Sequence, residues 1–197
     1  MNRREALRYT TWLAGTGLLV PGVWATLQSC QDSPVGESWM PRELSQSQVN
    51  QLINLSDTII PATTTPSASD VKVHQFVDVL IADVLAEEQI ASIKDGLQTI
   101  DELSRNETQT AFEKLSSEQL NTLVSQIDQA AFQEDSISEQ EARFHANYRY
   151  LKALILLTYF TSEEGVKQNL NYVVIPGEYN GCMDLPEDAK VMVGNHM

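Results

Sequence analysis

Cysteine is scarce in this chain of 197 residues, which has only Cys30 and Cys182. No C-x-x-C pair and no C-x-x-C-H occurs, which excludes zinc and iron–sulfur sites built on such pairs and a c-type haem attached to the chain. No G-x-G-x-x-G and no G-x-x-x-x-G-K-[ST] loop occurs either, so no dinucleotide or phosphate loop is predicted. The chain therefore carries no recognisable motif for a cofactor of its own.

Basic residues are also few, with 13 against 27 acidic ones and a formal net charge of −14. Such a surface repels phosphate backbones, so we expect no nucleic acid among the partners. No D-x-[DN]-x-[DN]-G loop supports calcium binding. Adjacent acids such as Glu87-Glu88 and Glu163-Glu164 point about 100° apart on a helix, so they are interpreted as solvated surface or first-turn charge.

Histidine is sparse too, since His74, His145 and His196 are widely separated and none belongs to an H-E-x-x-H motif. The first two fall in predicted helices, where a hydrogen-bonded structural histidine is expected. Catalysis needs a nucleophile with a base, paired carboxylates in a cleft, a metal cluster or a cofactor loop. The sequence shows none of these, and we expect a chain that is not itself an enzyme.

Long apolar runs are missing except near the N-terminus, where Tyr9 to Val23 is mostly apolar. This run of about 15 residues is short for a membrane crossing, which takes about 20. Arg3 and Arg4 stand side by side in the basic segment that precedes it. We expect residues 1–29 to be a removable signal peptide of the twin-arginine type, which exports folded proteins; a plain secretory signal is the alternative.

The apolar run ends at Leu27-Gln28-Ser29-Cys30, which resembles the lipobox of bacterial lipoproteins, where the cysteine becomes the acylated first residue. Gln28 is larger and more polar than that pattern usually has, so a cysteine lying by chance near a conventional cleavage site is the alternative. A lipid on Cys30 would hold the chain to the membrane, and we expect a membrane-anchored protein of the bacterial periplasm. Cys182 would then have no disulfide partner within the chain and is interpreted as a small buried residue or an incidental thiol, with an intermolecular bridge as the alternative.

Residues 30–43 are polar, with two prolines and a glycine, and predict a tether to a helical domain over residues 44–197. Capping boxes mark three helix starts, at Ser45 with Gln48, at Ser116 with Gln119 and at Ser138 with Glu141. Apolar residues at helical spacing follow these starts and also fill two further segments between the first two boxes. The expected stripes on the second, third and fifth helices are Val73, Phe76, Val77, Leu80, Ile81, Val84 and Leu85; Ile90, Ile93, Leu97, Ile100 and Leu103; and Phe144, Tyr148, Leu151, Leu154, Ile155 and Tyr159.

Strand signals are confined to the short run Tyr172 to Ile175. The sequence therefore predicts an all-α fold, an irregular bundle of five or six helices with a long C-terminal loop or tail. Two segments lie outside the bundle: the loop Ile60 to Pro66, where Pro61 ends the first helix, and the tail from Thr161 onward. In the tail, Thr161 or Ser162 is expected to cap a further helix.

The tail continues with a Pro176-Gly177 turn and with Tyr179 before Gly181. Tyrosines on a loop shaped by proline and glycine suit a partner-binding surface, because they supply rigid contact area and one polar group. A tail folded back on its own core is an equally good interpretation from the residues alone.

Three groups of residues resemble those of a known family. They are the Arg3-Arg4 leader; the loop Ile60-Pro61-Ala62-Thr63 with Thr65-Pro66, followed by Val73, Phe76 and Asp78; and the patterns Tyr159-Phe160-Thr161-Ser162-Glu163-x-Gly165 and Pro176-Gly177-x-Tyr179-x-Gly181. In these features the chain resembles the gluconate 2-dehydrogenase subunit 3 family, the small subunit of membrane-bound flavoprotein sugar dehydrogenases.

The resemblance implies an accessory role. In such complexes a large FAD-binding subunit of the glucose-methanol-choline type oxidises a sugar or sugar acid, and a cytochrome subunit passes electrons to the respiratory chain. The small subunit carries the twin-arginine signal and escorts the flavoprotein, so FAD is expected on the large subunit, haem on the cytochrome and no cofactor on this chain. The lipobox is a departure from the simplest family members and would add an anchor.

We expect the contact surface for the flavoprotein in the loop from Pro61 to Pro66 and in the tail from Tyr159 to Gly181. A stand-alone acidic lipoprotein that binds a ligand or a glycan is the alternative function. The residues expected at the partner interface are Pro61, Thr63, Pro66, Tyr159, Phe160, Thr161, Ser162, Glu163, Gly165, Pro176, Gly177, Tyr179 and Gly181.

Overall fold

A computed structural model describes residues 39–133, 138–173, 175, 182, 184 and 189–194. The chain divides into two units, Met1–Met40 and Pro41–Met197, and every described helix and strand belongs to the second unit. Several residues singled out from the sequence lie outside the described residues. These are Arg3, Arg4 and Cys30 of the expected signal and lipid site, and Pro176, Gly177, Tyr179 and Gly181 of the tail.

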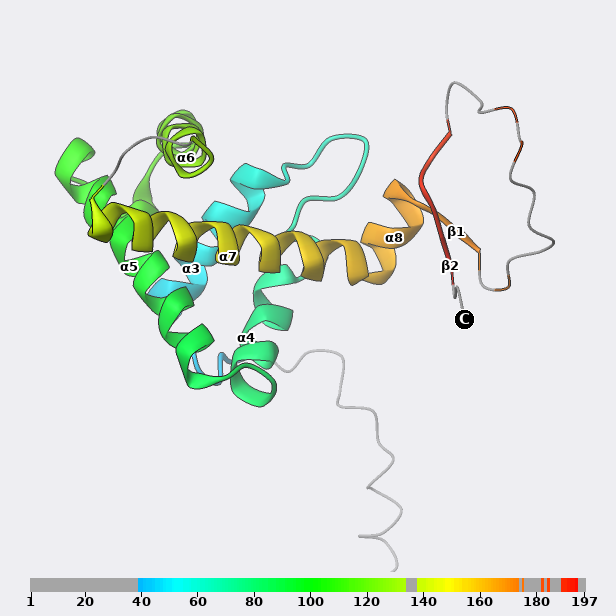
Figure 1. Cartoon of the computed structure of the whole chain (residues 1–197), viewed down its shortest axis with the longest axis horizontal. Coiled ribbons are helices and arrows are strands. Elements are labelled where there is room, and N and C mark those ends of the chain that lie inside the picture. The colour runs from blue at the N-terminus through cyan, green and yellow to red at the C-terminus, as the bar shows by residue number, and fades with distance from the viewer. Residues whose placement is uncertain are drawn as a thin grey trace, which may run out of the picture. The chain divides into compact units, whose positions relative to one another are not determined.

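The described part of the second unit is mostly helical, as Figure 1 shows, and the expected all-α bundle of five or six helices is confirmed. It contains six α-helices, one 3₁₀ turn between the third and the fourth of them, and two short strands after the last. In chain order they are α3 (Gln46–Ile59), α4 (Val73–Asp83), α5 (Glu87–Thr108), η3 (Phe112–Lys114), α6 (Ser117–Ala131), α7 (Glu139–Thr161), α8 (Glu163–Asn169), β1 (Asn171–Val173) and β2 (Met192–Gly194).

All three predicted capping boxes are present at the helix starts. The backbone N–H of Ser45 donates to Gln48 Oε1 at 2.9 Å, and the N–H groups of Ser116 and Ser138 make the equivalent bonds at 3.0 and 2.9 Å. Each cap is worth about 1 kcal/mol because it satisfies amide groups that the helix itself leaves open. Helix α3 ends at Ile59 with Ile60 as its C-cap, so Pro61 follows the helix as expected.

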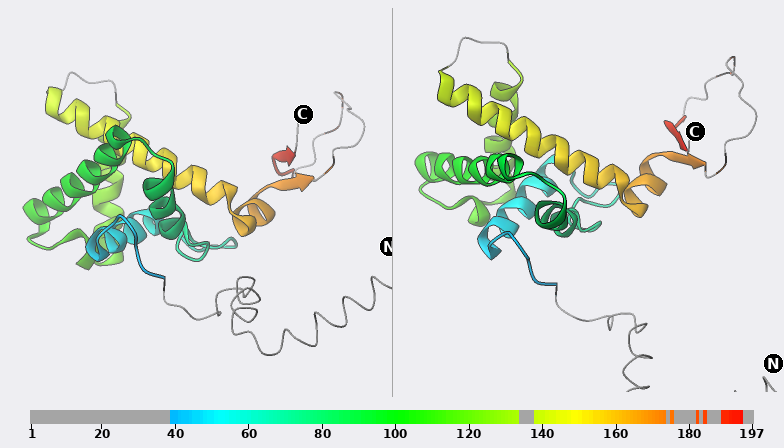
Figure 2. Two further views of the ribbon diagram at one scale, coloured as in Figure 1. Left: turned by 90° about the horizontal axis from the view of Figure 1, so that it is seen from below. Right: turned by 60° about the horizontal axis from the view of Figure 1, so that its bottom comes forward.

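The core is built on α7 and α3. Helix α7 contacts α4, α5, α6 and α8, and α3 contacts α4, α5 and α6; Figures 1 and 2 show α7 as the long yellow helix with α4 and α5 beside it. Along α7 the wholly buried side chains recur at helical spacing, which confirms most of the predicted stripe. They are Tyr148, Leu151, Ile155 and Tyr159.

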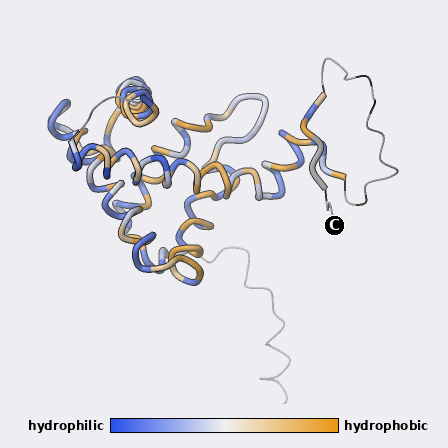
Figure 3. Tube along the Cα trace, in the orientation of Figure 1, coloured by the Kyte–Doolittle hydropathy of each residue, from blue (hydrophilic) through white to orange (hydrophobic). Residues whose placement is uncertain are grey.

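Figure 3 shows hydrophobic and hydrophilic residues interspersed along the helices. The buried residues of α3, α5 and α6 recur at helical spacing, so each of these helices buries one side. Among the described residues, no helix is both long enough and apolar enough to cross a membrane. The largest fully buried side chains come from α3, α4, α5, α7 and η3 and include Leu52, Leu55, Ile81, Ile93, Leu97, Ile100 and Phe112.

Helix α4 buries less of its apolar surface than its sequence predicts. Val73, Val77 and Ile81 are buried, but Phe76 is 42% exposed and Val84, just past the end of the helix, is 68% exposed. The reason is packing: α4 contacts α3 and α7, and these neighbours cover a narrower stripe than the broad one that the sequence offers.

The sequence predicted the first of the two strands but not the second. The apolar run at Tyr172 falls in β1, which pairs in parallel with β2 so that Asn171 faces Met192 and Val173 faces Gly194. Parallel strands need a long connection, so no hairpin signal marked the second strand. The turn η3 was not predicted either.

Asp78 fixes the start of the domain. Its carboxylate is 0% exposed and accepts hydrogen bonds from the backbone N–H groups of Arg42 at 2.7 Å, Glu43 at 3.1 Å and Leu44 at 3.0 Å. The Arg42 side chain also donates to both oxygens of Asp83 at 2.6 and 2.8 Å. Residues 42 and 43, expected in the tether, are therefore bonded to the helical domain.

Candidate partner-binding surface

Tyr159 joins the two segments that the sequence singled out. Its hydroxyl donates to the carbonyl oxygen of Pro66 at 2.8 Å and accepts from the Asn169 side-chain amide at 3.1 Å. Pro66 and Tyr159 are 93 positions apart in the sequence. The loop after α3 and the corner between α7 and α8 therefore meet at one buried hydroxyl.

The corner itself is held by Ser162, which ends α7 and caps α8. Its hydroxyl donates to the carbonyl oxygen of Tyr159 at 2.7 Å and accepts from the N–H of Gly165 at 3.0 Å, so the expected cap is confirmed at Ser162. A Cβ on Gly165 would lie 2.0 Å from the Tyr159 carbonyl oxygen. Glycine is therefore required at this position because the backbones approach too closely for a side chain.

The loop is closed at its base by main-chain and carboxylate contacts. The N–H of Ala68 donates to the carbonyl of Ile60 at 3.1 Å, and the N–H of Ser69 donates to Asp57 Oδ1 at 2.7 Å. Pro61 and Thr63, nearer its tip, are exposed. The loop thus presents exposed residues from a base that the rest of the domain holds in place.

The described interface candidates range from buried to exposed, with Pro66 and Ser162 partly buried. Tyr159 is 1% exposed and Gly165 is buried, so the expectation that they offer contact area is corrected: they shape the corner from inside. Phe160 is 39% exposed, and its ring stands edge-on to that of Tyr159 with centroids 5.1 Å apart. We define the corner surface as the exposed candidates Pro61, Thr63, Phe160, Thr161 and Glu163.

The corner between α7 and α8 carries negative charge. Glu163 and Glu164 lie in the first turn of α8, where the helix dipole favours negative charge. A hydrogen bond from Lys167 lowers the pKa of Glu163 below its ordinary value and raises the pKa of Lys167. Both side chains are exposed, so the pair adds little stability, but Glu164 keeps the corner negative.

Asn169 is the part of this site that sequence reasoning missed. Its side-chain amide donates to the Gly165 carbonyl at 2.9 Å as well as to the Tyr159 hydroxyl. An asparagine at the end of a short helix carries no local signal for such a role, since the partner is supplied by another helix.

Replacing Tyr159 by phenylalanine is expected to lower the free energy of unfolding by about 1–2 kcal/mol, because the Pro66 carbonyl and the Asn169 amide lose their common partner. Chemical denaturation of the full chain measures this change. Tyr150→Phe is the matched control on the same helix, because the Tyr150 hydroxyl makes no hydrogen bond to any described residue, and its effect should stay within about 0.5 kcal/mol. Equal losses for the two variants would contradict the role given to Tyr159.

Several side chains that could do acid–base chemistry are instead used by the fold. Asp101 accepts from the N–H of Phe112 at 2.8 Å, in the same way that Asp57 and Asp78 bind backbone amides. His74 is partly buried, and burial is the main cause that lowers its pKa from the ordinary value. Within the part of the chain that the structure describes, no three His, Cys, Asp or Glu side chains form a possible metal-binding group.

A small cavity of about 190 Å³ lies among α3, α6 and α7. Beside it the buried Tyr148 hydroxyl donates to Asp128 at 3.0 Å, and Lys152 pairs with the same carboxylate. Burial, together with Asp128, raises the pKa of Tyr148 well above its ordinary value. The Lys152 ammonium also lies 5.0 Å from the centre of the Phe132 ring, so the cluster ties α6 to α7.

Comparison with known protein families gives a match over most of the helical domain. The family described as gluconate 2-dehydrogenase subunit 3 matches residues 46–177, more than half of the chain. The chain belongs to this family. The match begins at α3 and includes both segments that meet at Tyr159, so the resemblance seen in the sequence is confirmed. No curated protein and no solved structure matches the chain.

Membership of the subunit 3 family implies that the chain is one subunit of a multisubunit gluconate dehydrogenase complex. Of the residues singled out from the sequence, the loop and the corner fall inside the family match. Arg3, Arg4, Cys30, Tyr179 and Gly181 fall outside it.

Proposed function

We propose that this chain is the non-catalytic small subunit of a membrane-associated sugar or sugar-acid dehydrogenase whose large subunit carries FAD. The observation that supports this most strongly is the family match over residues 46–177. The substrate would be oxidised on the large subunit, a cytochrome subunit with haem would accept the electrons, and this chain would hold and escort the flavoprotein.

The corner surface is the proposed contact with the flavoprotein. Phe160 offers an exposed aromatic ring, and the loop residues Pro61 and Thr63 belong to the segment that Tyr159 ties to the same corner. Aromatic side chains supply much of the binding energy of protein interfaces. Lys167 offsets the charge of Glu163, and Glu164 leaves the corner negative, so the matching patch on the flavoprotein should be basic.

The leader supports the escort role. Arg3 and Arg4 precede the apolar run, and a twin-arginine signal exports a protein that is already folded. A folded flavoprotein bound to this chain would cross with it and would need no signal of its own. A lipid on Cys30 would then keep the complex at the membrane on the periplasmic side.

Replacing Arg3 and Arg4 by lysine is expected to leave both this chain and its flavoprotein in the cytoplasm. The two chains are co-produced, and cell fractionation followed by flavin fluorescence locates the flavoprotein. A plain secretory signal tolerates the change because lysine keeps the positive charge, so the experiment also separates the two export routes. Arg8→Lys is the matched control and should leave export intact. Export of the flavoprotein without this chain, or with both lysines in place, would contradict the escort role.

A further inference from the structure

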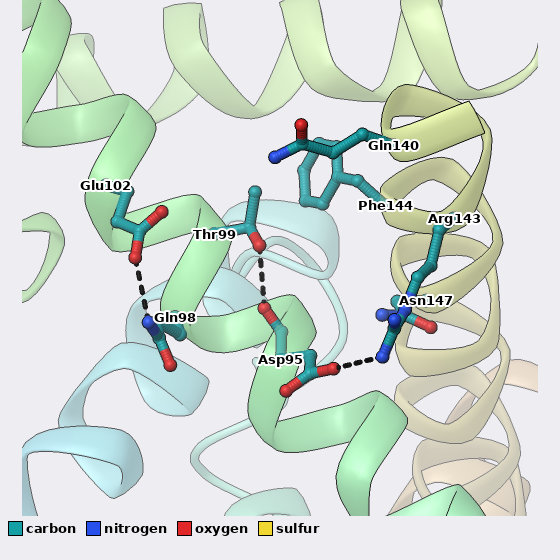
Figure 4. Close-up of a pocket in the computed structure, with 8 residues that line it drawn as sticks. All are labelled: Asp95, Gln98, Thr99, Glu102, Gln140, Arg143, Phe144 and Asn147. Atoms are coloured by element: carbon teal, nitrogen blue, oxygen red, sulfur yellow. Dashed lines mark hydrogen bonds and ion pairs between the residues drawn. The ribbon is translucent and has the colours of Figure 1, made fainter. Parts of the chain in front are cut away.

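A groove of about 260 Å³ lies between α5 and α7 on residues that the proposed partner surface does not use. Each helix presents four side chains to it at spacings of three and four residues, which places them on one face. Figure 4 shows all eight side chains that line the groove, with Gln140 and Phe144 of α7 directed toward Thr99 of α5. They are Asp95, Gln98, Thr99 and Glu102 from α5, and Gln140, Arg143, Phe144 and Asn147 from α7.

The two helices pack against each other beside this groove, where Gly96 of α5 faces Asn147 of α7. Gly96 is buried, and a Cβ at this position would lie 3.6 Å from the Cβ of Asn147. Helix α5 packs extensively on α7, so the groove is bounded by two regular helices. Its side chains are therefore placed by rigid elements and not by a loop.

Part of the lining is already ordered by internal bonds. Arg143 donates to Asp95 Oδ2 at 2.9 Å, Gln98 donates to Glu102 Oε1 at 2.8 Å, and the Thr99 hydroxyl donates to the Asp95 carbonyl at 2.8 Å. These are the dashed lines of Figure 4. The second oxygens of Asp95 and Glu102 make no hydrogen bond to any described residue, so acceptors remain available in the groove.

The side-chain amides of Gln140 and Asn147 are also open, since neither bonds to a described residue. An amide both donates and accepts hydrogen bonds, and so does a sugar hydroxyl. The partly buried Phe144 supplies an apolar ring at the same place. A ligand that suits this lining has several hydroxyl groups and one apolar C–H face.

The charge of the groove selects against an anion. Asp95 offsets the single cation, Arg143, through their ion pair, and Glu102 leaves the lining negative. The Glu102 carboxylate would repel a carboxylate or phosphate bound in the groove, whereas it would not repel a neutral ligand. The volume lies just below the range of about 300–1,000 Å³ typical of drug-sized ligands, so one small ring fits better than a larger cofactor.

We propose that the groove between α5 and α7 binds one ring of a neutral sugar, a hexopyranose. Carboxylate and amide groups bind its hydroxyls, and Phe144 packs against its C–H face. The site is independent of the corner surface, because it uses α5 and the first half of α7.

The test is a titration of the full-length chain, purified in detergent, with methyl α-D-glucopyranoside and with maltotriose, followed by ligand-observed saturation-transfer NMR. We expect saturable binding of the methyl glucoside. If maltotriose binds with the same affinity as the methyl glucoside, the natural ligand is a free monosaccharide. If maltotriose binds more tightly than the methyl glucoside, the natural ligand is a glycan chain. Gluconate, which has an open chain and a carboxylate, should bind more weakly than either. No saturable binding of either sugar, or tighter binding of gluconate, would overturn the proposal.

Phe144→Ala and Gln140→Ala are each expected to weaken binding about tenfold, the equivalent of about 1.4 kcal/mol. Gln140 is exposed, so its replacement should not disturb folding, and far-UV circular dichroism checks both variants. Phe132→Ala, an exposed aromatic outside the groove, is the control and should leave affinity unchanged. If neither groove variant weakens binding, the site lies elsewhere and the proposal fails. The flavoprotein is absent from this titration, so its result is separate from that of the export experiment.

Discussion

Gly165→Ala is expected to lower the free energy of unfolding by about 2–4 kcal/mol, the largest effect we expect from adding one methyl group. The new Cβ would lie 2.0 Å from the Tyr159 carbonyl oxygen and 2.6 Å from Ser162 Oγ. The backbone at the corner must move to relieve this overlap. The move strains the packing and breaks the hydrogen bond by which Ser162 caps α8. Chemical denaturation of the full chain, followed by far-UV circular dichroism, measures the loss.

Gly96→Ala is the matched control, because this glycine is also buried and helical. Its added Cβ would meet Asn147 at 3.6 Å, an ordinary van der Waals contact. Alanine is the better helix former, so this variant should gain about 0.5–1 kcal/mol of stability. If both alanines were tolerated equally, the close approach at the α7–α8 corner would be wrong.

Asp78→Ala is the second large change, with an expected loss of about 3 kcal/mol in the free energy of unfolding. It removes the carboxylate that accepts from three consecutive backbone amides, and one of them, the N–H of Leu44, is in a buried contact. Buried donors left without an acceptor cost about 1–3 kcal/mol. Thermal and chemical unfolding of the full chain measure the loss, and limited proteolysis before residue 46 should become faster.

Two further variants separate the contributions at this site. Asp78→Asn keeps one acceptor oxygen for two of the three amides, so an intermediate loss is expected. Asp83→Asn changes the exposed partner of Arg42 and should cost less than about 1 kcal/mol, because exposed ion pairs contribute little. An Asp83 variant as damaging as Asp78→Ala would show that the surface pair, and not the buried carboxylate, fixes the start of the domain.

The sequence predicted the features of this fold that depend on neighbouring residues. A capping box needs only a serine and a glutamine or glutamate three positions later, so Ser45, Ser116 and Ser138 could be identified before any packing was known. The α7 stripe follows from the same local periodicity. The family could also be recognised, because its loop and corner motifs are short and continuous in sequence.

Features that depend on distant residues could not be predicted in this way. The hydrogen bond from Tyr159 to Pro66 spans 93 positions. Tyr159 was expected on the partner surface, but it is buried where the loop meets the α7–α8 corner. The pairing of β1 with β2 and the partial exposure of α4 depend on which neighbours cover them. The groove between α5 and α7 combines ordinary polar residues, which form no motif until two helices bring them together.

The proposed role of this subunit is to hold a flavoprotein, and isolating the chain under native conditions shows whether a flavoprotein is bound. The chain is tagged at its C-terminus, extracted from the membranes of the cells that make it, and separated by size, while flavin absorbance and protein mass are recorded. We expect a complex in which FAD elutes with the chain in constant ratio, and in which Phe160→Asp lowers that ratio. A chain that elutes as a monomer without flavin would contradict it.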